Sequence, residues 1–124
     1  MLLIDTHILL WALYDSDKLT PKAKLAMKNE KCCVSIASLW EIAIKQSLGK
    51  LQIRQSIEEI AEQCRDNGVG IIGIEPRHCQ KQIELPFLHK DPFDRIIIAQ
   101  AVTEGHAIIT ADEHIWQYDV MTLW

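Results

Sequence analysis

Apolar and polar positions along the chain follow two periods, which together predict short strands alternating with helices. Short apolar runs bounded by turn residues are typical of strands, whereas apolar residues three or four positions apart are typical of helices. Strands are expected at 1–5, 32–34, 69–74 and 106–110, with a fifth, weaker pattern at 119–123. Helices are expected at 7–14, 21–29, 36–48, 57–67, 76–84 and 92–104, with a helical turn at 113–117.

The helix boundaries carry capping signals. Thr6 and Ser35 precede the first and third helices, where a hydroxyl accepts a hydrogen bond from a free N–H of the first turn. Asp91 stands directly before Pro92. This pair favours a helix cap over a role for Asp91 in a functional site. Gly105 ends the same helix, which is the strongest helical pattern in the chain.

Strands that alternate with helices indicate an α/β fold. The expected architecture is a mostly parallel central sheet of four to five short strands flanked by helices, with right-handed crossovers. The length of 124 residues fits a single domain, 1–124. In such sheets a ligand crevice lies beyond the carboxyl ends of the strands. No apolar window approaches the roughly 18 residues of a membrane span.

Charge gives an ambiguous indication of the partner. The net charge of −4 and pI of about 5.7 are unfavourable for a protein that binds phosphates. Two explanations remain open. Bound divalent cations would neutralise an acidic cluster, or basic residues are concentrated locally, for example Lys45, Lys50, Arg54, Lys90 and Arg95.

Cysteine and histidine positions argue against a zinc site or disulfides. The four cysteines contain no C-x-x-C pair, so we expect reduced structural thiols. The five histidines have no metal-like spacing and are interpreted as surface or loop residues. The opening run has no basic leader and includes Asp5 and His7, which argues against a signal peptide. We therefore expect a cytoplasmic protein.

Asp94 is the carboxylate that the hydrophobic pattern explains least well. Its neighbours at i+3, i+4 and i+7 are Ile97, Ile98 and Ala101, so it lies in the middle of an apolar helix face. A bare carboxylate there is costly unless something pairs with it or binds it. Arg95 is adjacent and faces elsewhere. A metal ion or a distant basic residue must therefore satisfy Asp94.

Three further acids have a structural interpretation as well as a functional one. Asp5 and Asp112 follow predicted strands, and each is also a normal helix cap. Glu41 lies at the edge of a helix face that we expect Ile36, Trp40, Ala43 and Ile44 to bury. A surface ion pair with Lys45, four residues on, would also explain Glu41.

Taken together, four carboxylates on different elements favour a site for a hard cation. Mg²⁺ and Mn²⁺ prefer carboxylate oxygens, waters and phosphates, and clustered carboxylates cannot all ionise comfortably without a cation. Two such ions activate water and stabilise the leaving oxygen of a phosphodiester. Asp5, Glu41, Asp94 and Asp112 are the candidate metal ligands and catalytic residues. Whether one or two ions bind at rest stays open.

Four segments in order along the chain carry a family resemblance: LLIDTHILLWAL, SIASLWEIAIKQSLGKL, LPFLHKDPFDRIIIAQA and AIITADEHI. They resemble the motifs of PIN-domain proteins, most closely the VapC-type toxins of bacterial toxin–antitoxin pairs. The resemblance implies a PIN-like fold and an Mg²⁺- or Mn²⁺-dependent endoribonuclease. It maps the family's acidic quartet onto Asp5, Glu41, Asp94 and Asp112, with Thr6 and Thr110 beside the site.

The resemblance also implies partners. VapC-type toxins form homodimers and are blocked by a small antitoxin protein whose tail crosses the active-site groove. Apolar residues that would serve such contacts, if they are not simply part of the core, are Trp11, Tyr14, Leu48, Leu51 and Ile53. The leading hypothesis is therefore a toxin that cleaves RNA by metal-assisted water attack.

Three other functions fit the sequence less well. A receiver-like phosphoacceptor domain would need an acidic pair after the first strand and an acceptor Asp after a middle strand, and neither is present. A catalytically silent PIN interaction module would be favoured by loss of one of the four acids, but all four are in place. A restriction-type nuclease core does not match either, because Glu41 and Lys45 are four residues apart.

Overall fold

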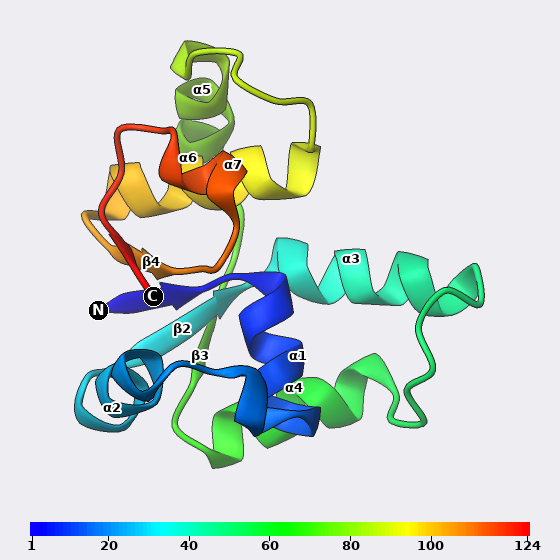
Figure 1. Ribbon diagram of the computed structural model, residues 1–124. Helices are drawn as coiled ribbons and strands as arrows, with labels where there is room; N and C mark the ends of the chain where they lie inside the picture. The colour runs from blue at the N-terminus through cyan, green and yellow to red at the C-terminus, as the bar shows by residue number, and fades with distance from the viewer.

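In a computed structural model, which describes residues 1–124, the chain forms five strands and seven α-helices (Figure 1). The strands are β1 (Leu2–Ile4), β2 (Cys32–Ser35), β3 (Gly70–Ile72), β4 (Ala107–Ile109) and β5 (Thr122–Leu123). The helices are α1 (Thr6–Tyr14), α2 (Pro21–Asn29), α3 (Ile36–Ser47), α4 (Ile57–Asp66), α5 (Pro76–Glu84), α6 (Pro92–Glu104) and α7 (Glu113–Trp116).

All strand pairs are parallel, in the order β3-β2-β1-β4-β5. β1 is the central strand, and its Leu3 lies opposite Cys33 of β2 and Ile108 of β4. The strand order reverses between β1 and β4, since β2 and β3 extend the sheet on one side of β1 and β4 and β5 on the other. The carboxyl ends of these two strands therefore mark the expected ligand crevice.

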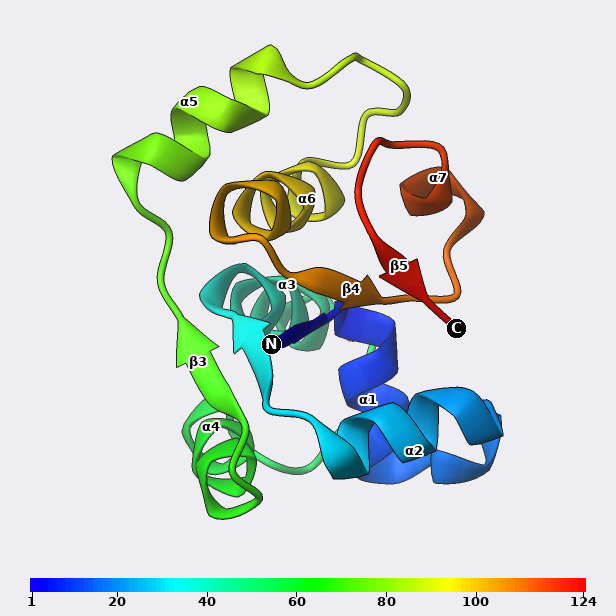
Figure 2. The same ribbon diagram turned by 90° about the vertical axis from the view of Figure 1, so that its left-hand side faces the viewer.

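Alternating residues of each strand build two separate cores. Leu2 and Ile4 of β1 pack with side chains from α1, α3 and α4. Leu3 faces the other way and packs with Ile97 and Ile98 of α6. Figures 1 and 2 both place α5, α6 and α7 on one side of the sheet and α1, α2 and α4 on the other. The sheet thus has helices on both faces, as the near-continuous apolar strands require.

The predicted order of strands and helices is confirmed, with two local differences. A 3-10 helix, Ser16–Lys18, occupies part of the segment expected to be a loop. The cap of α1 is Asp5, whose carboxylate accepts the N–H of Ile8 at 2.8 Å, and not Thr6. The strand turns into the helix one residue earlier than expected, so Thr6 becomes the first helical residue.

The buried face of α3 was predicted wrongly. Trp40 is 62% exposed and Ile36 is 42% exposed. Ala37, Ser38, Leu39, Glu41 and Ile42 are the residues that face the interior. The apolar i, i+4 spacing of Ile36 and Trp40 correctly indicated a helix, but the side that packs is set by its neighbours α1, α4, α6 and β2.

The cysteines are unpaired, as expected. Cys32, Cys33 and Cys64 are buried, whereas Cys79 is exposed on α5. Burial raises the pKa of the Cys33 thiol to about 11. None of the helices has the length and hydropathy needed to cross a membrane.

Candidate metal centre

The carboxyl ends of β1 and β4 bring Asp5 and Asp112 to the same edge of the sheet. The backbone N–H of Asp5 donates to the carbonyl of Ile109, at 3.2 Å. The hydroxyl of Thr110 lies beside the Asp5 carboxylate and accepts the backbone N–H of Asp112 at 3.0 Å. Asp5 is only 4% exposed, and this burial raises its pKa, although Thr110 lowers it in part. One threonine thus holds both acids in place.

Glu41 lies on the inner face of α3 and is 6% exposed, deeper than the helix-edge position expected. Its Oε2 pairs with Lys45 Nζ at 3.0 Å, so the predicted i, i+4 ion pair is confirmed. Its Oε1, however, is buried without any hydrogen-bond partner. A carboxylate oxygen that has been desolvated and left unpaired is a free ligand atom.

Asp94 lies near the amino end of α6, on a face with the fully buried Ile97, Ile98 and Ala101. Burial is the main cause that raises the pKa of Asp94 to about 8. The negative charges of Asp91, Asp112, Glu41 and Asp5 raise it further, in that order of size. Three of these acids, Asp112, Glu41 and Asp5, are the other predicted candidates, so their carboxylates lie near enough to Asp94 to influence its charge. We call Asp5, Glu41, Asp94 and Asp112 the acidic site.

Asp91 caps α6, as predicted. Its Oδ1 accepts the N–H groups of Phe93 at 2.9 Å and Asp94 at 3.1 Å. Asp112 likewise caps α7 by accepting the N–H of His114 at 2.9 Å. Capping and membership of the acidic site are therefore compatible, because a cap uses only one of the two carboxylate oxygens.

A histidine that the sequence reasoning missed orients Asp94. His89 Nε2 lies 3.1 Å from Asp94 Oδ2, and His89 Nδ1 lies 2.7 Å from the hydroxyl of Tyr118. Its ring stacks on that of His114, with 5.4 Å between centroids and 6° between planes. His89 lies in a loop, as expected, but its side chain is only 10% exposed and turns toward the acidic site. This loop comes just before the DPFD segment, and a loop has no hydrophobic period from which the position of a side chain could be predicted.

Arg95, offered above as a local basic residue, is instead part of the scaffold. It is 4% exposed and donates to the carbonyls of Pro86 and Gln82 and to the hydroxyl of Tyr118. Arg95 therefore holds the segment between α5 and α6 through its backbone carbonyls, and its burial keeps it from binding a phosphate. These contacts satisfy the two terminal nitrogens of the guanidinium without a pairing to Asp94, while the Nε of Arg95 is buried without a partner.

The acidic site fits a hard divalent cation. The donor set consists of carboxylate oxygens from four separate elements, which is the chemistry that Mg²⁺ and Mn²⁺ prefer. Two observations indicate missing positive charge: the unpartnered Oε1 of Glu41 and the raised pKa of Asp94. A cation would relieve both, because it favours ionised carboxylates and accepts their lone pairs.

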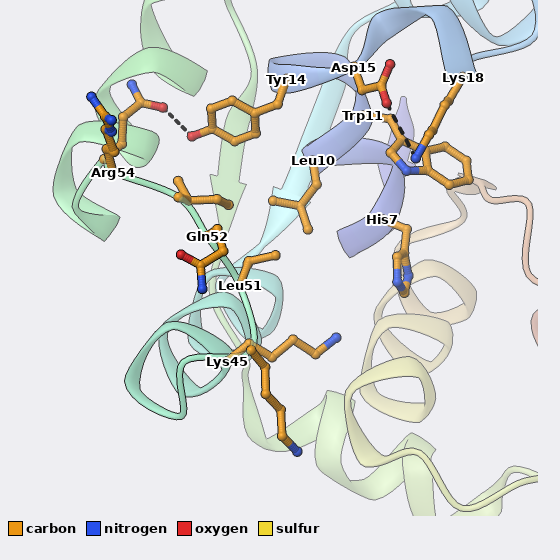
Figure 3. Close-up of a pocket in the computed structure, with 13 residues that line it drawn as sticks. His7, Leu10, Trp11, Tyr14, Asp15, Lys18, Lys45, Leu51, Gln52 and Arg54 are labelled. Atoms are coloured by element: carbon orange, nitrogen blue, oxygen red, sulfur yellow. Dashed lines mark hydrogen bonds and ion pairs between the residues drawn. The ribbon is translucent and has the colours of Figure 1, made fainter.

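The other predicted cations gather beside this site. A groove of about 770 Å³ runs between α1 and the segment 50–55, and its lining includes Lys18, Lys45, Lys50 and Arg54. Figure 3 shows Leu10 and Tyr14 of α1 pointing toward that segment. Lys45 also lines a smaller cavity, of about 360 Å³, with Glu41, Lys90, Asp91 and Phe93. Lys45 therefore lies between the basic, partly apolar groove and the cavity that contains Glu41.

A second acidic cluster lies elsewhere, between α5 and α6. Ligand atoms of Glu75, His78 and Glu104 lie within 4.8 Å of one another. His78 Nδ1 accepts the N–H of Glu75 at 2.9 Å, and its Nε2 lies 2.9 Å from Glu104 Oε1. Arg77 pairs with both glutamates. Every charge already has a partner, so we call this group the ion-pair cluster and interpret it as structural. His78 is 2% exposed and lies on α5, so its interpretation as a surface or loop residue was wrong.

Comparisons with known proteins agree with this geometry. The model of the PIN domain family matches residues 2–120. The chain is 25% identical over 115 residues to ribonuclease VapC22 of Mycobacterium tuberculosis, which covers 91% of this chain and 88% of the relative.

Solved structures share the fold. VapBC2 of Rickettsia felis, bound to a fragment of its promoter DNA, superposes with a TM-score of 0.73 at 15% identity, covering 98% of this chain and 96% of that one. A toxin–antitoxin complex of Klebsiella pneumoniae gives a TM-score of 0.68 at 18% identity, covering 100% and 97%. The predicted α/β, PIN-like architecture is therefore confirmed.

Proposed function

The chain belongs to the PIN domain family, and on that premise we propose that it is a metal-dependent endoribonuclease acting as the toxin of a toxin–antitoxin pair. The observation that carries the proposal is the convergence of four carboxylates from four elements on one edge of the sheet. The resemblance to a curated ribonuclease and to toxin–antitoxin complexes supports the same activity.

Asp5, Glu41, Asp94 and Asp112 are the proposed ligands of Mg²⁺ or Mn²⁺. The chemistry supplied by such a cation is Lewis-acid activation of water and neutralisation of phosphate charge. Thr110 keeps Asp5 and Asp112 at a fixed separation, and His89 fixes the rotamer of Asp94. Such outer contacts orient ligating carboxylates.

The substrate phosphates are bound by lysines beside the acids. Lys45 and Lys90 both line the small cavity that contains Glu41. Lys45 holds one oxygen of Glu41 and is 35% exposed, so it is also accessible to an anion. This local cationic edge explains how a chain with a net charge of −4 attracts RNA.

The antitoxin partner is proposed to occupy the large groove. Trp11, Tyr14, Leu51 and Ile53, four of the residues expected to serve such contacts, line it, and Leu48 is exposed nearby at the end of α3. An apolar floor with a basic rim fits an amphipathic peptide that carries acidic side chains. Occupation of Lys45 by such a peptide would also hinder access to the acidic site.

Two further expectations belong to this proposal. We infer a homodimer from the family resemblance. An RNA target and four unpaired cysteines fit a reducing, cytoplasmic environment.

The test is cleavage of RNA with added Mg²⁺ or Mn²⁺. We expect Asp5→Asn and Asp94→Asn to lose at least about a hundred-fold in rate while remaining folded, because each removes a ligand charge. Glu104→Gln, in the ion-pair cluster, is the matched acid control and should retain cleavage. Full activity of both acidic-site variants would refute the proposal. A wild-type protein that binds RNA but never cleaves it would favour the silent PIN module.

A further inference from the structure

Trp40 is exposed where a large aromatic side chain is normally covered. It lies on α3 with 62% of its surface exposed, although its spacing from Ile36 is that of a buried helix face. Tryptophan has the largest apolar surface of any side chain, and leaving it in water forgoes a substantial gain from burial. An exposed tryptophan beside a functional site is therefore a candidate for ligand contact.

The exposed ring has one aromatic partner. Trp40 meets Phe93 of α6 edge to face, with 5.5 Å between ring centroids and 75° between planes. This contact holds the indole in one orientation and leaves most of its surface free. Each of the two aromatics directly precedes an acid of the acidic site, Glu41 and Asp94 respectively. Phe93 also lines the small cavity that contains Glu41, so the pair lies beside the acidic site and is contributed by two different elements.

Cations surround the same place. Phe93 lines the small cavity together with Lys45 and Lys90. Aromatic faces next to lysines form the combination that binds single-stranded nucleic acids, in which bases stack on rings and phosphates pair with cations. The bases of a duplex are already stacked and are not available to such a platform.

We propose that Trp40, supported by Phe93, stacks a nucleobase of the RNA next to the scissile phosphodiester. This inference rests on the proposed ribonuclease function and adds a binding residue to it. Lys45 and Lys90 contact the adjacent phosphates. The platform then sets which nucleotide step is presented to the four carboxylates.

The test is binding of a labelled ten-nucleotide single-stranded RNA, measured by fluorescence anisotropy in an Asp94→Asn background that leaves the RNA uncleaved. Trp40→Ala should weaken binding roughly ten-fold or more, and Trp40→Phe should recover part of the loss. Ile83→Ala is the control, because Ile83 is 70% exposed on α5 and outside the site. Trp40→Ala should leave the salt dependence unchanged, whereas Lys45→Ala should reduce its slope by about one counterion.

A series of RNAs, each with one abasic position, makes the test specific. At the stacked position, the loss of affinity caused by removing the base and the loss caused by Trp40→Ala should not be additive, because both remove the same contact. Equal affinity of the Trp40→Ala and Ile83→Ala variants would overturn the proposal, as would additive losses at every position. A shift from dimer to monomer in sedimentation, without loss of RNA affinity, would instead assign Trp40 to an interface between copies. If the wild-type chain still cleaves RNA in these cases, only the platform fails; if it neither binds nor cleaves RNA, the ribonuclease proposal fails as well.

Discussion

The molecule contains two clusters of acidic side chains, and they differ in how their charges are balanced. In the ion-pair cluster, Glu75 and Glu104 share Arg77, and His78 bridges the two helices. The guanidinium and the His78 ring favour the ionised form of Glu104, and its pKa is lowered, with the hydrogen bond from His78 as the main cause. The cluster is complete as it stands and ties α5 to α6.

In the acidic site, by contrast, the negative charges are not balanced by positive ones. Four carboxylates converge there, with Lys45 as the one cation in contact with Glu41 and His89 as the one ring in contact with Asp94. Burial and neighbouring negative charge raise the pKa of Asp94 to about 8. Similar residue types therefore serve opposite purposes: balanced charges stabilise a helix pair, whereas unbalanced charges form a site that favours a cation.

The largest effect on folding is expected from the ion-pair cluster. His78→Ala should destabilise the fold by about 3 kcal/mol, since it removes a buried side chain, leaves the Glu75 N–H without a partner and leaves Glu104 with only the exposed Arg77. Denaturant unfolding measures this, with His7→Ala as a control because His7 is exposed. Equal stability of the two variants would show that the cluster does not hold α5 to α6.

An effect of intermediate size is expected from the contact between His89 and Asp94. His89→Ala should weaken Mn²⁺ binding by about 10- to 100-fold, because an outer partner no longer orients the ligand. His106→Ala, just beyond the carboxyl end of α6, serves as the control. Unchanged Mn²⁺ affinity in the His89 variant would mean that packing alone positions Asp94.

Removing a charge should stabilise the metal-free protein at the acidic site, whereas it should destabilise the protein in the ion-pair cluster. In metal-free protein, the folded state retains the Asp94 proton up to about pH 8, whereas the unfolded chain releases it near 3.8. The unfolding free energy should therefore fall as the pH rises between these values.

Asp94→Asn should remove this pH dependence. It should also stabilise the metal-free protein at pH 8 by about 1–2 kcal/mol, which is a fraction of the free energy that the whole pKa shift of Asp94 represents at about 1.4 kcal/mol per pKa unit. Urea unfolding with a chelator at pH 5 and pH 8 measures both. A variant that is less stable than the wild type at pH 8 would contradict the account of unbalanced charge.

The smallest effect is expected at the rim of the ion-pair cluster. Arg77 is more than half exposed, so its ion pairs with Glu75 and Glu104 are screened by solvent. Arg77→Gln should cause a slight loss of stability that disappears at high salt. A large loss that persists in salt would mean that the arginine, and not His78, holds the two helices together.

Much of the fold follows from local patterns. Strands and helices were predicted because apolar runs, caps and glycines agree with one another along the chain. Asp94 could be singled out because it interrupts a helix face whose other members are fully buried. Asp5 and Asp112 could be placed together because parallel strands share one carboxyl edge.

The rest depends on contacts between distant segments. The inner face of α3 is determined by its neighbours α1, α4, α6 and β2, and periodicity alone assigned Trp40 to the core when it is exposed. His89 lies in a loop whose course is set by Arg95 and Tyr118, which periodicity does not reveal. The ion-pair cluster joins residues 26 positions apart and has no sequence signature.

The measurement that tests the central claim most directly is calorimetric titration of Mn²⁺ into the wild-type chain, Asp94→Asn and Glu104→Gln. The account predicts that the wild type and Glu104→Gln bind Mn²⁺ with the same affinity and that Asp94→Asn loses binding. Retention of binding by Asp94→Asn together with its loss in Glu104→Gln would assign the metal to the ion-pair cluster. Absence of binding to the wild type would contradict a metal centre at the acidic site.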